Sequence, residues 1–322
     1  MIFAYVSQAG KLVPVPLSPG AALESAVWVD LYRPLPGQTD QVNALGVEVP
    51  TLADMEEIEI SNRLYRENGV DYLTVVLPGM SETRQPISGP VTFILTAQRL
   101  VTVRHHVPRP FETYPERADK VGPGCDGTDK VFLGLMEEII GRLADLLEGS
   151  GRALEEVTRS VYVSDRRQKT AAALQDALER VGRESDLVAR IRLSLLTLER
   201  AISFFGQTLG ERPAGEGLRP VVKGMMRDIQ ALEVHGDYLS SRVAQATDAT
   251  LGMINLLQNT AVRIVSVVAV LFLPPTLIAS IYGMNFRLMP ELAQSWGYPM
   301  ALGMMVASAV ITYSVFKWKK WL

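Results

Sequence analysis

The sequence predicts an α/β domain followed by helical segments, a long helix and a membrane hairpin, and three observations support that prediction. Two uncharged runs, residues 264–286 and 292–316, each exceed the roughly 20 residues that a helix needs to cross a bilayer. Thirteen of the 19 prolines lie in residues 1–123, where short β-rich runs alternate with turns. No proline lies in residues 124–212, which favours uninterrupted helices because proline breaks helix interiors.

Residues 1–125 are expected to form a cytoplasmic α/β domain. Runs rich in β-branched and aromatic residues predict its strands at Met1–Val6, Val27–Tyr32, Tyr72–Leu77, Val91–Thr96 and Leu100–Arg104. Only three residues separate the last two strands, so we expect a hairpin there. Helices are predicted at Asp40–Leu45 and Thr51–Asn62, the second with Thr51 as its N-terminal cap.

Composition and motifs exclude several classes of function. The net charge of −3 argues against nucleic acid as a partner. A single cysteine, Cys125, fits a reducing compartment, and the first residues lack the features of a signal peptide, so the front domain is expected to stay in the cytoplasm. We find no phosphate loop, nucleophile elbow or zinc-ligand spacing in this domain, and His105-His106 is interpreted as structural. We therefore expect neither an enzyme nor a bound cofactor.

Residues 126–216 are expected to form a cytoplasmic helical hairpin. Helical periodicity occurs in two pieces, Lys130–Val163 and Asp165–Gly210. The second piece repeats leucine and isoleucine at helical spacing, which predicts a buried stripe made of Leu187, Ile191, Leu195 and Leu198. An antiparallel arrangement of the two helices fits this pattern.

A stalk helix is predicted over residues 217–258, and it continues directly into the first membrane span, residues 259–282. Between Pro220 and Pro274 there is no further proline, so we expect one helix of about 60 residues ending at Tyr282, roughly 90 Å long. A helix of this length is not stable alone. It needs partners along its length, which suggests that the chain oligomerises around it.

Basic residues predict the orientation of the two spans in the lipid bilayer. Arg263 precedes the first span, and Lys317, Lys319 and Lys320 form a basic tail on the second. The connecting loop, residues 283–296, has no clear basic excess. The positive-inside rule therefore places both chain ends in the cytoplasm, the loop outside, and residues 297–322 as the second span and its cytoplasmic tail.

One face of the long helix carries a polar stripe. At about 100° per residue, Asp248, Asn255, Asn259 and Ser266 fall close to one line. The same line, continued through the membrane, passes near Val262, Ala269, Leu273, Thr276 and Ser280. Copies of this helix around an axis would give a pore with polar rings and a dry constriction. An ordinary helix-bundle core with a few buried amides explains the pattern equally well.

The end of the first span carries a recognisable motif. Tyr282–Phe286 reads YGMNF, with LPPTLIAS before it at residues 273–280, MPEL at 289–292, WGYP at 296–299 and the basic tail KWKKWL at 317–322. Upstream, residues 254–259 read INLLQN. With two terminal spans and a large front domain, this sequence resembles the CorA magnesium transporter family. The close resemblance covers residues 225–322, and the front domain agrees in architecture only.

The resemblance implies a homopentamer in the bacterial inner membrane that imports Mg²⁺, and also Co²⁺ and Ni²⁺, down the membrane potential. Gly283, Met284 and Asn285 would form the selectivity filter, and Glu291 an external ring that concentrates cations. Asp248 and Asn259 match pore-lining positions of the family. Cytoplasmic Mg²⁺ would close the pore by binding between subunits, where position suggests a role for Asp54 and Asp228.

Two alternatives and one departure from the family pattern stay open at this point. The zinc-transporting branch of the same superfamily shares the architecture, although the intact YGMNF and MPEL motifs argue against it. A membrane-anchored sensor would not need a permeation motif in its short loop. Many members of the family carry an acidic residue after the signature phenylalanine, whereas this chain has Arg287. We expect Arg287 to pair with Glu291 or to turn away from the pore.

Overall fold

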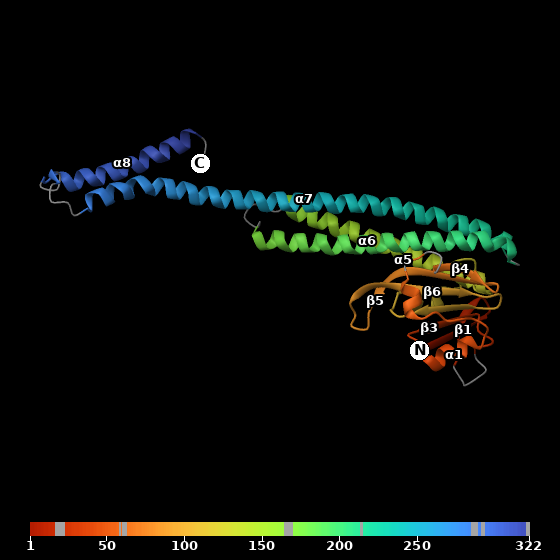
Figure 1. Cartoon of the computed structure of the whole chain (residues 1–322). Helices are drawn as coiled ribbons and strands as arrows, with labels where there is room; N and C mark the ends of the chain where they lie inside the picture. The colour runs from red at the N-terminus through yellow and green to blue at the C-terminus, as the bar shows by residue number, and fades with distance from the viewer. Residues whose placement is uncertain are drawn as a thin grey trace. The chain divides into compact units, whose positions relative to one another are not determined.

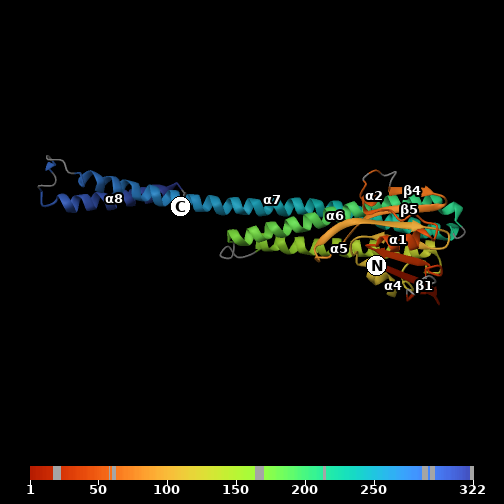
Figure 2. The same cartoon turned by 60° about the horizontal axis from the view of Figure 1, so that its bottom comes forward.

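The computed structural model describes residues 1–16, 23–57, 59, 63–163, 170–212, 215–284, 289–290 and 294–319. Two compact units emerge, one made of residues 1–164 and 176–248 and the other of residues 165–175 and 249–322. Both units are described separately below, although one helix contributes residues to each of them. Figures 1 and 2 show the chain from two directions.

A seven-stranded mixed sheet forms the centre of the first unit. Its strands are β1 (Ile2–Gln8), β2 (Lys11–Pro14), β3 (Trp28–Tyr32), β4 (Leu64–Glu67), β5 (Val70–Met80), β6 (Pro86–Leu95) and β7 (Leu100–Arg104). Their order across the sheet is β2-β1-β3-β7-β6-β5-β4. Only β3 and β7 pair in parallel, and the expected hairpin joins β6 to β7. All five predicted strands are present, and β2 and β4 are added at the two edges.

Short helices accompany the sheet. These are α1 (Pro36–Asn43), α2 (Leu52–Glu56) and α4 (Pro110–Arg117), the last of which was not predicted. Thr51 caps α2 as expected, because its hydroxyl accepts a hydrogen bond from the Asp54 amide. The prediction that this helix continues to Asn62 is wrong, since Glu57 already has an extended ψ of 138°. Residues 58 and 60–62 lie outside the described part of the chain.

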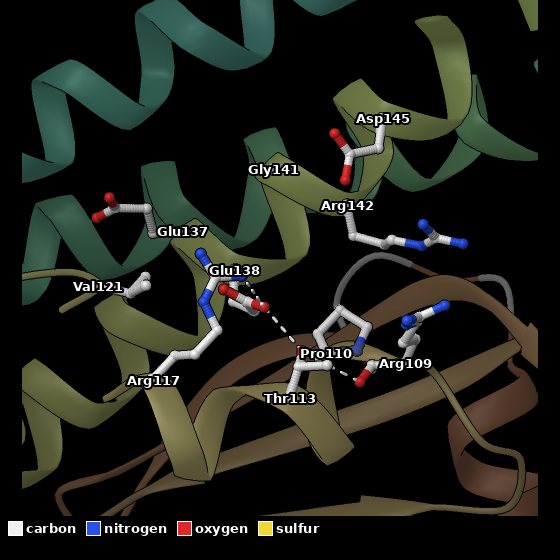
Figure 3. Close-up of a pocket in the computed structure, with 10 residues that line it drawn as sticks. All are labelled: Arg109, Pro110, Thr113, Arg117, Val121, Glu137, Glu138, Gly141, Arg142 and Asp145. Atoms are coloured by element: carbon white, nitrogen blue, oxygen red, sulfur yellow. Dashed lines mark hydrogen bonds and ion pairs between the residues drawn. The ribbon is translucent and has the colours of Figure 1, made fainter. Parts of the chain in front are cut away.

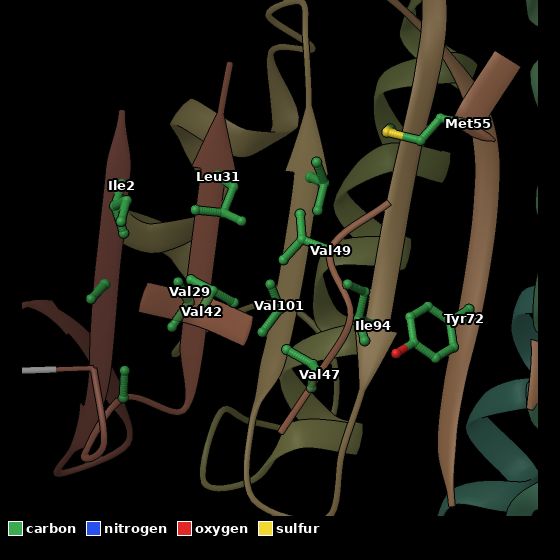
Figure 4. Close-up of a cluster of buried hydrophobic side chains, with 13 residues drawn as sticks. Ile2, Val29, Leu31, Val42, Val47, Val49, Met55, Tyr72, Ile94 and Val101 are labelled. Atoms are coloured by element: carbon green, nitrogen blue, oxygen red, sulfur yellow. The ribbon is translucent and has the colours of Figure 1, made fainter. Parts of the chain in front are cut away.

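Apolar side chains pack on both faces of the sheet. On one face, strand residues such as Val29 and Val101 pack with Val42 of α1 and with Val47 and Val49 (Figure 4). The opposite face carries an aromatic cluster that joins the sheet to the long helices. Burial of this much apolar and aromatic surface is the main source of the unit's stability.

The aromatic cluster connects three layers of the first unit. The ring of Phe93 on β6 meets that of Phe132 with centroids 5.6 Å apart, and Phe132 in turn lies 4.9 Å from Phe205. Phe132 belongs to α5 (Thr128–Val163) and Phe205 to α6 (Ala171–Thr208). The two helices lie side by side in both views (Figures 1 and 2). Of the predicted stripe on α6, Ile191, Leu195 and Leu198 are fully buried, and Leu187 is partly buried.

The long helix is present and is longer than predicted. After a short 3₁₀ turn, η2 (Leu209–Glu211), helix α7 runs for 68 residues from Gly215 to Tyr282. It starts five residues before Pro220 and ends at Tyr282, where the sequence places its end. At about 1.5 Å per residue it is roughly 100 Å long.

The second unit contains two helices that are long and apolar enough to cross a membrane, the end of α7 and α8 (Gly297–Trp318). Helix α8 runs back beside the last part of α7 in both views (Figures 1 and 2). Its less exposed positions recur at helical spacing and are mostly small, namely Gly297, Met300, Ala301, Met305, Ser308, Ala309, Thr312 and Phe316. Small residues let two membrane helices approach closely, which explains the pairing.

Candidate ion pathway

The nine residues predicted to line a pore all lie on helix α7. Each of them is exposed in the single chain, and they are Asp248, Asn255, Asn259, Val262, Ser266, Ala269, Leu273, Thr276 and Ser280. Val262 and Leu273 each keep 64% of their surface exposed, an unusual cost for large apolar side chains in water. The exposed stripe therefore needs a bilayer, another chain or a pore axis beside it.

The opposite face of α7 is the one that α8 covers. From residue 267 onward, the half-buried positions of α7 are Val267, Leu271, Pro274, Pro275, Ile278 and Tyr282. On a helical wheel these positions centre roughly 170° from the part of the predicted stripe within the membrane span. One cavity is lined by Phe316 of α8 and by Val267 of this face, and Ser266 of the predicted stripe borders the same cavity. Apart from Ser266, the part of the stripe within the membrane span lies on the side of α7 that faces away from α8.

The motif begins where α7 ends. The Gly283 amide donates to the Ala279 carbonyl at 2.9 Å, and the Met284 amide donates to the Ile281 carbonyl at 3.3 Å. A Cβ atom at position 283 would lie 3.0 Å from the Ala279 carbonyl oxygen, so glycine fits this tight helix end best. The C-terminus of a helix also carries partial negative charge, which favours a cation near Gly283 and Met284.

Several predicted residues around the loop lie outside the described part of the chain. These are Asn285, Arg287, Glu291 and the last lysine of the tail, Lys320. Their roles stay predictions. Lys317 lies in the last turn of α8 and Lys319 is its C-terminal cap, where positive charge complements the helix dipole.

The double proline does not interrupt α7. Pro274 and Pro275 have no amide hydrogen, so the carbonyls of Val270 and Leu271 lose their usual helical donors. The helix nevertheless continues to Tyr282. Unpaired carbonyls inside a membrane span need water or another polar group, which a pore would supply.

The two candidate regulatory carboxylates lie on separate elements of the first unit. Asp54 is exposed at the start of α2, and its carboxylate accepts hydrogen bonds from the Thr51 hydroxyl at 2.6 Å and the Thr51 amide at 2.8 Å. These hydrogen bonds lower the pKa of Asp54. Asp228 is exposed on α7. Among the described residues, no three His, Cys, Asp or Glu side chains gather as a metal site within the chain.

Sequence reasoning missed two buried charged networks. On β3, Asp30 accepts hydrogen bonds from the Thr102 hydroxyl at 2.8 Å and from the Arg104 guanidinium at 2.8 Å. On β5, Asp71 is fully buried and pairs with Arg212, which follows η2 and also binds Asp129 of α5. Asp30 and Asp71 are each an acidic residue within an otherwise apolar strand, and this pattern could have indicated a buried ion pair.

Comparison with known proteins identifies relatives along the whole chain. A family model described as CorA-like Mg²⁺ transporter protein matches residues 24–319. The magnesium transport protein CorA of Pasteurella multocida is 33% identical over 323 residues, covering 100% of both chains. Proteins of the same name from Salmonella typhimurium and Haemophilus influenzae are each 32% identical, covering 100% and 93% of both chains respectively.

Solved structures share the fold. The CorA magnesium transporter from Methanocaldococcus jannaschii matches with a TM-score of 0.74 at 17% identity, covering 100% of this chain and 99% of that one. The full-length CmaX protein matches with a TM-score of 0.65 at 15% identity, covering 100% and 98%. The family model over most of the length, together with relatives above 30% identity, confirms the resemblance seen in the motifs. The chain belongs to the CorA-like Mg²⁺ transporter family.

Proposed function

We propose that this chain transports Mg²⁺ into the cell, with Co²⁺ and Ni²⁺ as further substrates, through a homopentameric pore in the bacterial inner membrane. The relatives named magnesium transport protein CorA support Mg²⁺ as the substrate. The unbroken YGMNF sequence at the end of the first span is the observation on which the proposal mainly rests. Both chain ends lie in the cytoplasm in this proposal, and the chain is a transporter rather than an enzyme.

The exposed stripe of α7 would line the pore. Helix α8 covers the other side of α7, so α8 occupies the outer ring and the stripe turns to the axis. Asp248, Asn255 and Asn259 then offer rings of oxygen atoms at the cytoplasmic end. Val262, Ala269 and Leu273 narrow the pathway inside the bilayer, where an apolar constriction can close by dewetting.

The chemistry of Mg²⁺ suits an amide-rich mouth. The ion is small and loses its water reluctantly, so it is recognised with waters still attached. Backbone carbonyls of the Gly283–Asn285 filter and the Asn285 amide can accept hydrogen bonds from those waters without holding the ion permanently. A ring of Glu291 carboxylates would raise the local cation concentration at the entrance.

In this proposal, the membrane potential drives ion entry and cytoplasmic Mg²⁺ controls the opening of the pore. A potential of 100 mV contributes roughly 4.6 kcal/mol to the entry of a divalent ion, so no nucleotide hydrolysis is needed. Cytoplasmic Mg²⁺ bound between Asp54 of one subunit and Asp228 of the next would hold the pore closed. Both carboxylates are exposed, which such a shared site requires.

The proposal is tested by ion flux into liposomes that contain the purified protein and a Mg²⁺-sensitive dye. We expect Mg²⁺ entry driven by a membrane potential, and an Asn285→Ala variant should lose most of it because the filter loses its amide. Ser314→Ala is the matched control, since Ser314 lies on α8 and donates to the Val310 carbonyl of its own helix at 2.7 Å.

Three outcomes would contradict the proposal. If Mg²⁺ flux survives in the Asn285→Ala variant, the assignment of the selectivity filter to this position is wrong. Zn²⁺ movement coupled to a proton gradient, without Mg²⁺ entry, would indicate the zinc-transporting branch. Absence of flux for either ion in correctly inserted protein would favour the membrane-anchored sensor.

A further inference from the structure

A large cavity lies in the first unit, and none of its lining residues belongs to the candidate ion pathway. It measures about 750 Å³ and is enclosed by the β5–β6 turn, the region before and within α4, and helices α5 and α6. Its apolar wall includes Met80, Val107, Leu146 and Leu187. This volume falls in the range of pockets that bind small organic molecules, roughly 300–1,000 Å³.

Three arginines line this cavity. They are Arg84 from the β5–β6 turn, Arg109 at the start of α4 and Arg142 from α5. Arg109 and Arg142 also line a neighbouring hollow of about 470 Å³, and Figure 3 shows their guanidinium groups extending toward the same side of it. The smaller hollow is also lined by Arg117 and by the carboxylates Glu137, Glu138 and Asp145, so an excess of positive charge belongs to the larger cavity alone.

The guanidinium groups of these three arginines are not engaged by carboxylates among the described residues of the chain. Within the part of the chain that the structure describes, none of the three guanidinium groups forms an ion pair, whereas Arg117 in the same hollow binds Glu138 at 2.9 Å. Two carboxylates, Glu82 and Glu112, line the larger cavity. Glu82 already pairs with Arg33, which lies outside the lining, so the balance of charge in the cavity is positive.

The backbone at Arg84 is unfavourable for an arginine. Its φ is +57°, in the left-handed region that glycine and asparagine tolerate best. The surrounding turn holds it there, because the Arg84 amide donates to the Ser81 carbonyl at 3.0 Å and the Gln85 amide donates to the Ser81 hydroxyl at 3.1 Å. From this turn the Arg84 side chain lines the cavity.

We propose that this cavity binds an organic phosphate with an apolar or aromatic body, of the nucleoside polyphosphate class. Guanidinium groups match phosphate oxygens with paired hydrogen bonds, and arginine is the side chain best suited to that geometry. The apolar wall formed by Met80, Val107, Leu146 and Leu187 would hold the nucleoside. This binding does not depend on the ion pathway, so its failure would leave the proposed transport function untouched.

The test is equilibrium binding of labelled ATP to the full-length protein in detergent, with EDTA present to remove divalent cations. We expect saturable binding, and an Arg84→Asn/Arg142→Gln double variant should weaken it at least tenfold. Arg152→Gln is the matched control on the same helix as Arg142, because Arg152 is an exposed arginine paired with Glu148 at 2.9 Å. The control should bind ATP as the parent chain does.

A second measurement separates loss of binding from loss of folding. Asparagine tolerates the left-handed backbone better than arginine, so Arg84→Asn alone should raise the melting temperature while it weakens ATP binding. Inorganic phosphate and adenosine, used as competitors, should each displace ATP at least tenfold less well than ATP itself. Unsaturable binding, equal loss in Arg152→Gln, unchanged binding in the double variant, or equal competition by inorganic phosphate would overturn the proposal.

Discussion

His106 lies beneath the β5–β6 ribbon, and its surroundings give the first unit a pH response. Only 2% of the residue is exposed, and a Cβ atom at Gly79 or Gly89 would come within 2.6 Å or 2.8 Å of its ring. Its Nε2 lies 2.9 Å from the Leu77 carbonyl oxygen. Burial lowers the pKa of His106 to about 4 from its ordinary value of 6.5, and the nearby Arg104 charge acts in the same direction.

This pKa shift predicts a loss of stability in mild acid. Between pH 6.5 and pH 4 the unfolded chain binds a proton at His106 that the folded chain does not, so unfolding becomes easier as the pH falls. The full contribution, present above pH 6.5, is on the order of 3 kcal/mol. As the pH is lowered from 7.5 to 4.5, the melting temperature of the purified protein should therefore fall more steeply than that of the His106→Gln variant. Equal slopes would contradict the prediction.

The structural roles of single residues differ in how well the sequence predicts them. Thr51 was predicted as a cap because a threonine that directly precedes a helical run is a local signal for a helix N-terminus. The two hydrogen bonds that the Asp54 carboxylate accepts from Thr51 were not predicted, although an acid at the third helical position permits them. The partner of Asp30 lies 74 residues away, so no local pattern identifies it.

At the scale of elements, a charged cluster joins three of them where α7 is about to begin. Arg212 binds Asp71 of β5 and Asp129 of α5, and Arg66 of β4 lies 3.4 Å from the Asp71 carboxylate. Burial raises the pKa of Asp129, while its ion pair with Arg212 opposes that effect. The cluster fixes the turn before α7 to the sheet.

Removing Arg212 should destabilise this unit strongly. An Arg212→Met variant keeps an unbranched apolar stem but leaves the Asp71 and Asp129 carboxylates buried without their main counter-charge, which costs about 3–5 kcal/mol. We expect a clear fall in the melting temperature followed by circular dichroism. Arg152→Met is the control, since exposed ion pairs contribute at most about 1 kcal/mol. Equal melting temperatures for the two variants would contradict the assigned role.

Elements with a strong period were predicted well, and edge elements were not. The central strands follow from β-branched runs, helices α5 and α6 from a proline-free segment, and most of α7 from the long gap between Pro220 and Pro274. Strands β2 and β4 are short, and β4 reads LYRE, so only pairing with β1 and β5 makes them strands. Helix α4 was not predicted because it contains Pro115, and proline was taken as a helix breaker.

At the scale of the whole molecule, the proposed pentamer predicts contacts between copies of α7 that a single chain cannot make. In that assembly, residues on the stripe would approach their copies around the axis, whereas residues facing α8 would not. Ala269→Cys should therefore form disulfide-linked dimers of the chain under oxidation in membranes, and Leu271→Cys should form few. The native Cys125 is buried, so it contributes little background. Equal cross-linking at the two positions would contradict a pore lined by the stripe.

The architecture could be predicted further than the assembly. Two uncharged runs and one long proline-free segment were enough for the order of the parts, because length and charge decide whether a helix spans a bilayer. How the copies associate is not encoded in any local period. The same stripe suits a pore or a bundle core. The YGMNF motif favours a pore only because proteins of this family carry it.

The length of α7 has a mechanical consequence. A rod of roughly 100 Å that tilts by one degree moves its far end by about 1.8 Å. That displacement approaches the length of a bond between Mg²⁺ and oxygen, about 2.0–2.1 Å. In the proposed pentamer, an angular change too small to unpack any side chain near Gly215 would be amplified at Gly283 into a movement on the scale of ion coordination. The helix would thus act as a lever, and the pore would need no hinge of its own.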